Sequence, residues 1–167
     1  FYSTEEDLIQ AFNLSGAESL SGINPTNLKS LRFPGKINLR KVKIPRYFAV
    51  FFNQNQSSVL SDKNVRLALA HSINKDAIIE SISGAGFKID SPMIPEIFPD
   101  FEANLKKYDY NPDFARQILD NSDWRDEDGD GRRSKKEQAL EIELVLPLKK
   151  ELALIGDLLK KNWEEIG

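Results

Sequence analysis

The chain has 167 residues, which is enough for one ordinary domain or for parts of two. Its 26 acidic and 23 basic residues give a net charge of −3 with both signs spread along the sequence, so a basic nucleic-acid-binding surface is not expected. The absence of cysteine excludes disulfides, thiolate metal sites and cysteine nucleophiles. Apolar runs are too short to cross a bilayer, and the pattern breaks off abruptly at both ends, so we expect an excerpt of a longer protein.

The first third of the sequence predicts two short helices and then two strands. Thr4, followed by three acidic residues, is typical of a helix start, and Asn24-Pro25 is typical of another. After the Pro34-Gly35 turn, residues 37–42 indicate a strand with basic side chains outward. Residues 47–52 form a nearly continuous aromatic and aliphatic run, which predicts a central strand covered on both faces.

Three polar residues predict the starts of helices in the middle of the chain. Asp62, Asn74 and Asn111 each precede an amphipathic segment, and a proline follows Asn111 at the first helical position. Residues 91–99 contain three prolines and therefore predict an extended loop.

The last part of the chain predicts one strand and one helix. Apolar residues at the even positions of 140–146 alternate mainly with acidic ones, which is the pattern of a half-buried strand. Residues 152–166 carry an apolar face at helical spacing. This mixture of helices and few strands predicts a mixed α/β (α+β) fold.

An acidic stretch between the last two predicted helices has the spacing of a twelve-residue calcium loop. Calcium takes six to eight oxygen ligands, which clustered carboxylates and carbonyls supply, and Gly131 would take the sharp turn. The alternative is a solvated acidic turn without a metal. The predicted ligands are Asp126, Asp128, Asp130, the backbone oxygen of Arg132, Ser134 through a water, and Glu137.

Three features predict a weak, structural calcium site rather than a paired sensor. Arg133 stands where a paired calcium hand has an aliphatic residue that joins its partner loop. Four basic residues oppose five acidic ones within the loop and lower its affinity for a cation. The segment after Glu137 is predicted to be a strand, so the arrangement is helix–loop–strand.

Several motifs follow one another in order along most of the chain. They are Tyr-Phe-Ala-Val-Phe-Phe-Asn at 47–53, Asp-Lys-Asn-Val-Arg at 62–66, Ile-Asn-Lys-Asp at 73–76, Ser-Pro-Met-Ile-Pro at 91–95, Tyr-Asp-Tyr-Asn-Pro at 108–112, and Trp124 with the Asp-Gly-Asp-Gly turn. In this order they resemble the family 5 extracellular solute-binding proteins, the peptide and nickel receptors of ABC importers. Asn111 in place of an aspartate and Asp123 in place of a glycine depart from the family pattern.

The resemblance implies a periplasmic-binding-protein-like fold, part of a receptor whose two lobes close on a ligand. Residues 1–45 would belong to the first lobe or the hinge, and residues 46–167 to a second-lobe segment truncated at its C-terminal end. The resemblance also implies an extracellular or periplasmic protein that delivers oligopeptides to an ABC permease. A lipid anchor outside this chain would hold it at the membrane. The alternative is a sensory or protein-interaction domain that kept the fold without transport.

The resemblance puts the predicted strand at 47–52 beside the ligand cleft. Tyr47, Phe52, Asn53 and Gln54 are therefore candidate ligand contacts, because a strand edge can hold the main chain of any peptide. The alternative for the two aromatic residues is a place in the core.

Other polar residues predict structural roles. Arg66 lies among apolar neighbours and is expected to form a partly buried ion pair with an acidic residue. His71, the only histidine, is expected to make a structural contact. No nucleophile elbow, phosphate loop or zinc motif occurs in the sequence, so we predict no catalytic residues and no enzymatic activity.

Overall fold

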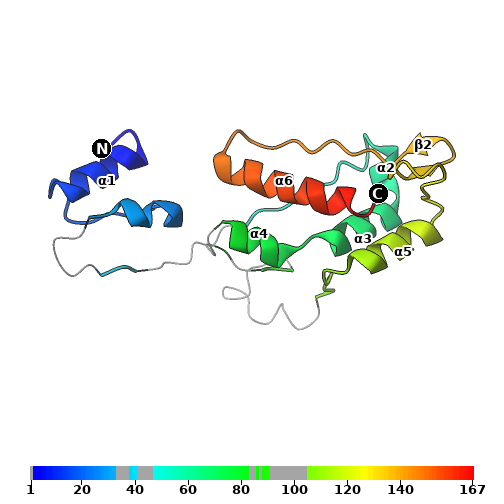
Figure 1. Cartoon of the computed structure of the whole chain (residues 1–167), viewed down its shortest axis with the longest axis horizontal. Helices are drawn as coiled ribbons and strands as arrows, with labels where there is room; N and C mark the ends of the chain where they lie inside the picture. Colours follow the sequence, from blue (N-terminus) through cyan, green and yellow to red (C-terminus); the bar gives the residue numbers. More distant parts are fainter. Residues whose placement is uncertain (1, 33–37, 41–46, 83–85, 87, 91–104) are drawn as a thin grey trace. The chain divides into compact units, whose positions relative to one another are not determined.

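The computed structural model describes residues 2–32, 38–40, 47–82, 86, 88–90 and 105–167, and Figure 1 shows the elements that they form. The chain divides into two compact units, Phe1–Pro45 and Arg46–Gly167. The assignment of these units to two lobes of a receptor stays a prediction.

The first unit holds an α-helix, α1 (Glu5–Asn13), and a 3₁₀ helix, η1 (Pro25–Ser30). The hydroxyl of Thr4 accepts a hydrogen bond from the amide of Asp7 at 3.1 Å and caps α1, as the sequence predicts. A carboxylate oxygen of Glu5 in α1 accepts the amide of Asn24 at 2.8 Å, which fixes the start of η1 against α1. Both predicted helices are confirmed, the second as a 3₁₀ helix.

The second unit is mainly helical, with one small sheet. Its described residues form α2 (Ser58–Ser61), α3 (Lys63–Ser72), α4 (Lys75–Ser81), α5 (Pro112–Asn121), β1 (Ser134–Lys135), β2 (Gln138–Ala139) and α6 (Lys150–Glu164). β1 and β2 pair antiparallel, with Ser134 opposite Ala139 and Lys135 opposite Gln138. The mixed α+β class is therefore confirmed.

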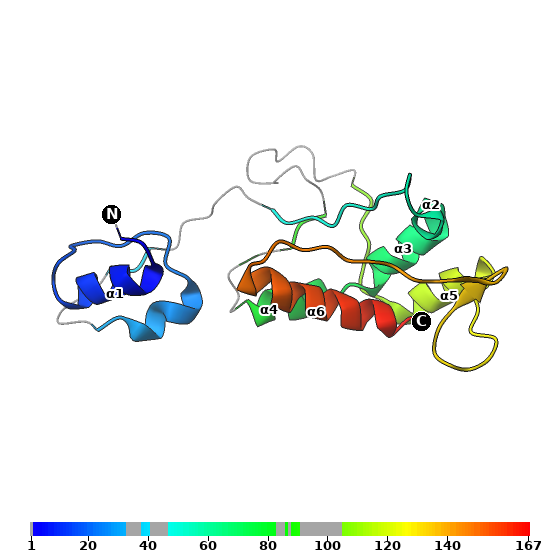
Figure 2. The same cartoon turned by 90° about the horizontal axis from the view of Figure 1, so that it is seen from above.

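Helices α3 and α5 pack against each other at the centre of the core. Val65 of α3 and Ala115 of α5 are completely buried, and Leu119 of α5 is 1% exposed. Trp124, after α5, and Ile166, after α6, belong to the same buried cluster. Helix α6 packs against α3 and α4, and Figure 2 shows it running beside α4.

The helix caps of the second unit lie where the sequence predicts them. Asp62 accepts the amide of Asn64 at 2.8 Å, Asn74 accepts that of Ala77 at 3.0 Å, and Asn111 accepts that of Phe114 at 2.9 Å. Helix α2, capped by Ser57, was not predicted, because four residues are too few to show a helical period.

The central strand predicted at 47–52 is wrong for the described structure. The segment forms no strand and pairs with no other described strand, and Phe51 is 87% exposed. A strand covered on both faces needs pairing partners and two covering layers, and β1 and β2 form the only sheet among the described residues.

Residues 140–146 form no strand, so that prediction is also wrong; only Leu140, whose amide donates to the carbonyl of Arg133 at 2.7 Å, continues the pairing of the hairpin. The alternation of the segment is nevertheless real, because Leu140, Ile142 and the other even-numbered residues are half-buried while Val145 is 80% exposed. The side chain of Leu146 lies against Gly156 of α6. Of the remaining predicted segments, the loop at 91–99 lies outside the described residues, and so does half of the strand at 37–42.

Helix α5 ends in a Schellman motif. The amide of Trp124 donates to the carbonyl of Leu119 at 3.0 Å, and the amide of Asp123 donates to that of Asp120 at 3.2 Å. Asp123 has φ of +64°, the left-handed conformation that normally selects glycine at this position. The motif turns the chain so that Trp124 enters the core.

We expect Asp123→Gly to raise the free energy of unfolding by about 0.5–1 kcal/mol, because glycine adopts positive φ without strain. Urea denaturation measures this gain. The matched control is Ser122→Gly at φ −107°, where glycine relieves nothing and should lower stability. A loss of stability in Asp123→Gly would contradict the strain argument.

Candidate functional site

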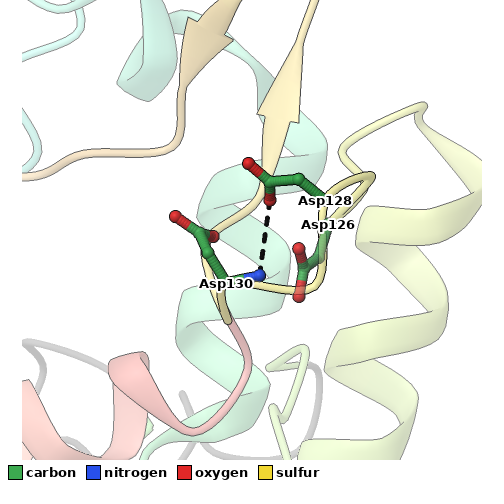
Figure 3. Close-up of side chains that lie close together, drawn as sticks. All are labelled: Asp126, Asp128 and Asp130. Carbon is green, nitrogen blue, oxygen red and sulfur yellow. Dashed lines mark hydrogen bonds between the residues drawn. The ribbon is translucent and has the colours of Figure 1, made fainter.

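The acidic loop follows α5 and leads into the β1–β2 hairpin. Asp126, Asp128 and Asp130 are exposed, and each places a carboxylate oxygen within 4.8 Å of the others; Figure 3 shows the three side chains around one turn of the chain. The chain can turn so tightly because Gly129 and Gly131 have φ of +76° and +85°. The spacing in the sequence therefore does bring the first three predicted ligands together.

Backbone amides of the loop hold these carboxylates. One oxygen of Asp126 accepts the amide of Gly129 at 2.8 Å, and the other accepts that of Gly131 at 3.0 Å. Asp128 accepts the amide of Asp130 at 3.3 Å, the dashed line in Figure 3, and Asp130 accepts that of Arg132 at 2.7 Å. Each carboxylate oxygen has a further lone pair, so these bonds are compatible with a cation.

Of the other predicted calcium ligands, the carboxylate of Glu137 lies outside this group. Arg132 is exposed, and Ser134 pairs through its backbone with Arg125 at 2.8 and 2.9 Å. Glu137 is the second residue of the two-residue turn between β1 and β2, and it is not among the three gathered carboxylates. The sequence did not reveal this turn, because Lys136 and Glu137 both have positive φ where asparagine and glycine are usual.

Arg133 connects the loop to the helices. Its side chain is 11% exposed and its guanidinium donates to the carbonyl of Ile166 at 2.7 Å, the carbonyl of Trp124 at 2.7 Å and the carboxylate of Asp120 at 2.5 Å. These three bonds explain why an arginine stands at a position where a paired calcium hand has an aliphatic residue. The loop docks against its own chain at this point.

Asp62 links the start of α3 to the hairpin. One oxygen caps α3, and the other accepts the indole N–H of Trp124 at 3.1 Å and lies 3.5 Å from the ammonium of Lys135. Burial opposes ionisation of Asp62, but the bonds from Trp124 and Asn64 and the charge of Lys135 together lower its pKa below the ordinary 3.8.

We expect Asp62 to make the stability of the fold depend on pH in the acidic range. Because its pKa is lower in the folded chain than in the unfolded chain, its contribution is present above the unfolded value and is lost as the pH falls through the folded pKa. Asp62→Asn should therefore flatten the dependence of unfolding free energy on pH between about pH 5 and pH 2. Asp157→Asn, which removes an exposed carboxylate of α6, is the control and should keep the wild-type slope. An unchanged slope in Asp62→Asn would contradict this assignment.

The predicted ligand contacts lie on the segment before α2, in which Gln54 begins a turn. Tyr47 is 43% exposed, whereas Phe52 is half-buried and packs against the core cluster. Asn53 and Gln54 are exposed; the amide of Asn53 donates to the side chain of Gln56 at 2.7 Å, and the backbone amide of Gln54 donates to the carbonyl of Phe52 at 3.0 Å. The segment thus offers polar side chains at its exposed end.

The sequence profile of the bacterial extracellular solute-binding proteins, family 5 middle region, matches residues 1–167. The chain belongs to this family. The resemblance inferred from the ordered motifs is thereby confirmed, together with the periplasmic-binding-protein-like fold.

Several known proteins are similar in sequence to part of this chain. It is 31% identical over 98 residues to the dipeptide-binding protein of Escherichia coli K12, covering 58% of this chain and 18% of that protein. It is 29% identical over 97 residues to heme-binding protein A of Haemophilus influenzae, covering 58% and 17%. A candidate ABC transporter peptide-binding protein of Brucella ovis is 35% identical over 81 residues, covering 45% and 14%.

The family 5 chain thus spans less than a fifth of each of these relatives. No solved structure matches it significantly. In the part of the chain that the structure describes, no helix is both long enough and apolar enough to cross a membrane.

Two further residues of this family 5 chain have structural contacts. Arg66 donates to the carbonyls of Leu60 and Ser61 at 2.8 and 2.9 Å, so among the described residues it caps α2 instead of forming the expected ion pair. Nδ1 of His71 lies 2.9 Å from the carbonyl oxygen of Asp109, which requires an N–H at that nitrogen. The imidazole ring also packs edge-on against Tyr108 and Phe114. His71 therefore holds the segment before α5 against α3.

Proposed function

We propose that the chain is part of the solute receptor of an ABC importer and that the receptor captures oligopeptides by closing around them. The observation that carries this proposal is the family match over the whole chain. The names of two relatives, a dipeptide-binding protein and a peptide-binding ABC transporter protein, support the peptide class. Binding and lobe closure need no chemical step, so the proposed receptor is not an enzyme.

The exposed end of the segment at 47–54 is the proposed contact with the peptide. Backbone groups of a segment that belongs to no described sheet can bond to the main chain of a peptide whatever its sequence, and Asn53 and Gln54 add polar groups that fit peptide amides. Tyr47 and Phe52 would flank these groups. The receptor would act outside the cytoplasmic membrane, deliver its ligand to a permease, and be held by a lipid anchor outside this chain.

A thermal-shift assay on the complete receptor tests the proposal. The panel would contain pooled di- to pentapeptides, nickel chelates, heme and oligosaccharides. A ligand at a hundred times its dissociation constant should stabilise the native state by about 2.7 kcal/mol. A shift with peptides alone would support the proposal. A higher melting temperature with another class alone would identify that class, and not peptides, as the ligand. No change with any class would favour the sensory or protein-interaction alternative.

The contact residues need their own variants. Asn53→Ala and Gln54→Ala should weaken peptide binding, each by about 0.5–1.5 kcal/mol for a lost hydrogen bond. Asn55→Ala, an exposed neighbour outside the predicted contacts, is the matched control and should bind as the unchanged protein does. Equal peptide affinities in all three variants would show that this segment is not part of the binding site.

We propose in addition that Asp126, Asp128 and Asp130 bind one calcium ion weakly and in a structural role. The support is the gathering of three carboxylates within 4.8 Å, with oxygen donors of the kind that calcium prefers. With Glu137 in the hairpin turn and amides on all three carboxylates, we expect a dissociation constant of roughly 0.1–1 mM. The ion would stiffen the connection between α5 and the hairpin.

Calcium titration followed by thermal unfolding tests this site. Asp128→Ala should remove the calcium-dependent part of the melting temperature and leave the fold intact at high calcium. Glu127→Gln is the matched control, because Glu127 is an exposed acid of the same loop outside the carboxylate group. A calcium response that is unchanged in Asp128→Ala would rule out the site.

A further inference from the structure

Two Asp-Gly peptide bonds of the loop have the chemistry that favours isomerisation of aspartate. Asp128-Gly129 and Asp130-Gly131 are the two Asp-Gly pairs of the sequence, and all four residues are exposed. Glycine has no Cβ to hinder the approach of its own amide nitrogen to the side chain of the preceding aspartate. The amide nitrogen can therefore attack the Cγ atom of that aspartic acid.

This reaction needs no reagent other than water. The glycine nitrogen forms a bond to Cγ of the protonated carboxyl group and loses its proton, while the carboxyl hydroxyl leaves as water. The resulting five-membered succinimide is then opened by one water molecule. Attack at one carbonyl restores aspartate, and attack at the other moves the peptide link to the side chain and forms isoaspartate. The mass of the chain does not change.

The structure shows that a single residue holds both attacking nitrogens. The Gly129 and Gly131 amides each donate to Asp126, at 2.8 Å and 3.0 Å, one to each carboxylate oxygen. Each N–H must leave this hydrogen bond before its nitrogen can reach Cγ of Asp128 or Asp130. An Asp126 carboxylate that keeps both amides occupied therefore reduces the fraction of time in which either reaction can begin.

We propose that Asp128-Gly129 and Asp130-Gly131 are the isoaspartate-forming sites of this chain, and that the carboxylate of Asp126 slows both reactions. No other aspartate of the sequence precedes a glycine. Asp123 precedes the bulky Trp124, Asp126 precedes Glu127, and Asp120 lies within α5, whose backbone is held by helical hydrogen bonds. Isomerisation at either site would insert an extra backbone atom into the turn that gathers the carboxylates.

The experiment compares rates of isoaspartate formation in the complete protein and in a synthetic peptide of residues 122–136. All samples contain EDTA, so the result is independent of the calcium proposal. Isoaspartate is measured by enzymatic methyl transfer to the isoaspartyl carboxylate and is located by fragment-ion mass spectrometry. The variants are Asp126→Ala and, as the matched control, Glu127→Gln, which removes a charge from the same loop without removing an acceptor of a glycine amide. Circular dichroism checks that both variants fold.

The folded protein should form isoaspartate at 128 and 130 about 10-fold more slowly than the peptide, the factor expected from one hydrogen bond that must open. Asp126→Ala should approach the rate of the peptide, and Glu127→Gln should keep the wild-type rate. Equal rates in the folded protein and the peptide would overturn the proposal without any variant. An unchanged rate in folded Asp126→Ala, or isoaspartate mainly at other aspartates, would overturn it as well.

Discussion

Replacing Leu119 by alanine is expected to lower the free energy of unfolding by about 2–5 kcal/mol. Leu119 is 1% exposed and belongs to the cluster in which α5 packs against α3. It also lines a cavity of about 360 Å³ between α3, the 140–146 segment and α6. The truncation would remove buried methyl groups and enlarge a space that the surrounding side chains already leave open.

Chemical denaturation of the protein and of Leu119→Ala measures this loss. The matched control is Leu154→Ala in α6, where the side chain is 44% exposed and the same truncation should cost less than about 1 kcal/mol. Equal losses in the two variants would show that the α3–α5 contact is not the centre of the core.

Replacing Arg133 by methionine is expected to cost about 2–3 kcal/mol, because the carbonyls of Trp124 and Ile166 lose their donor. Methionine keeps much of the apolar volume, so the loss reports hydrogen bonding more than packing. The ion pair to Asp120 adds little, since that carboxylate is 57% exposed.

Arg132→Met is the matched control for this prediction. Arg132 is the preceding residue and carries the same charge, but its side chain is exposed, and we expect a change within about 0.5 kcal/mol. Thermal unfolding is measured in EDTA, so that the stability change of each variant does not include an effect of calcium. Similar losses in both would mean that charge, rather than the buried bonds of Arg133, stabilises the loop.

The contacts of Arg133 indicate how much a bound calcium ion could add to the stability of the loop. Its bonds fix the loop against α5 and the end of α6 through the protein alone. A bound ion would therefore add to a loop that is already ordered, which agrees with a weak site. The same loop geometry keeps the two glycine amides on Asp126, so the proposed calcium site and the proposed protection against isoaspartate formation both use the carboxylate oxygens of Asp126.

Local chemistry was sufficient to predict much of this protein from its sequence. Each cap at Thr4, Asp62, Asn74 and Asn111 depends on a side chain that bonds an amide two or three residues away, so a short stretch of sequence contains the whole interaction. The gathering of Asp126, Asp128 and Asp130 is equally local. The ordered motifs were sufficient to identify the family.

Interactions between distant residues decided the rest. Whether 47–52 and 140–146 become strands depends on pairing partners, which apolar periodicity does not contain, and neither segment is a strand of the sheet that the described residues form. Arg133 reaches Ile166 across 33 positions, and Asp62 reaches Trp124 across 62. Composition alone cannot predict such bonds, because the energy of a polar side chain depends on which carbonyl or indole folding places beside it.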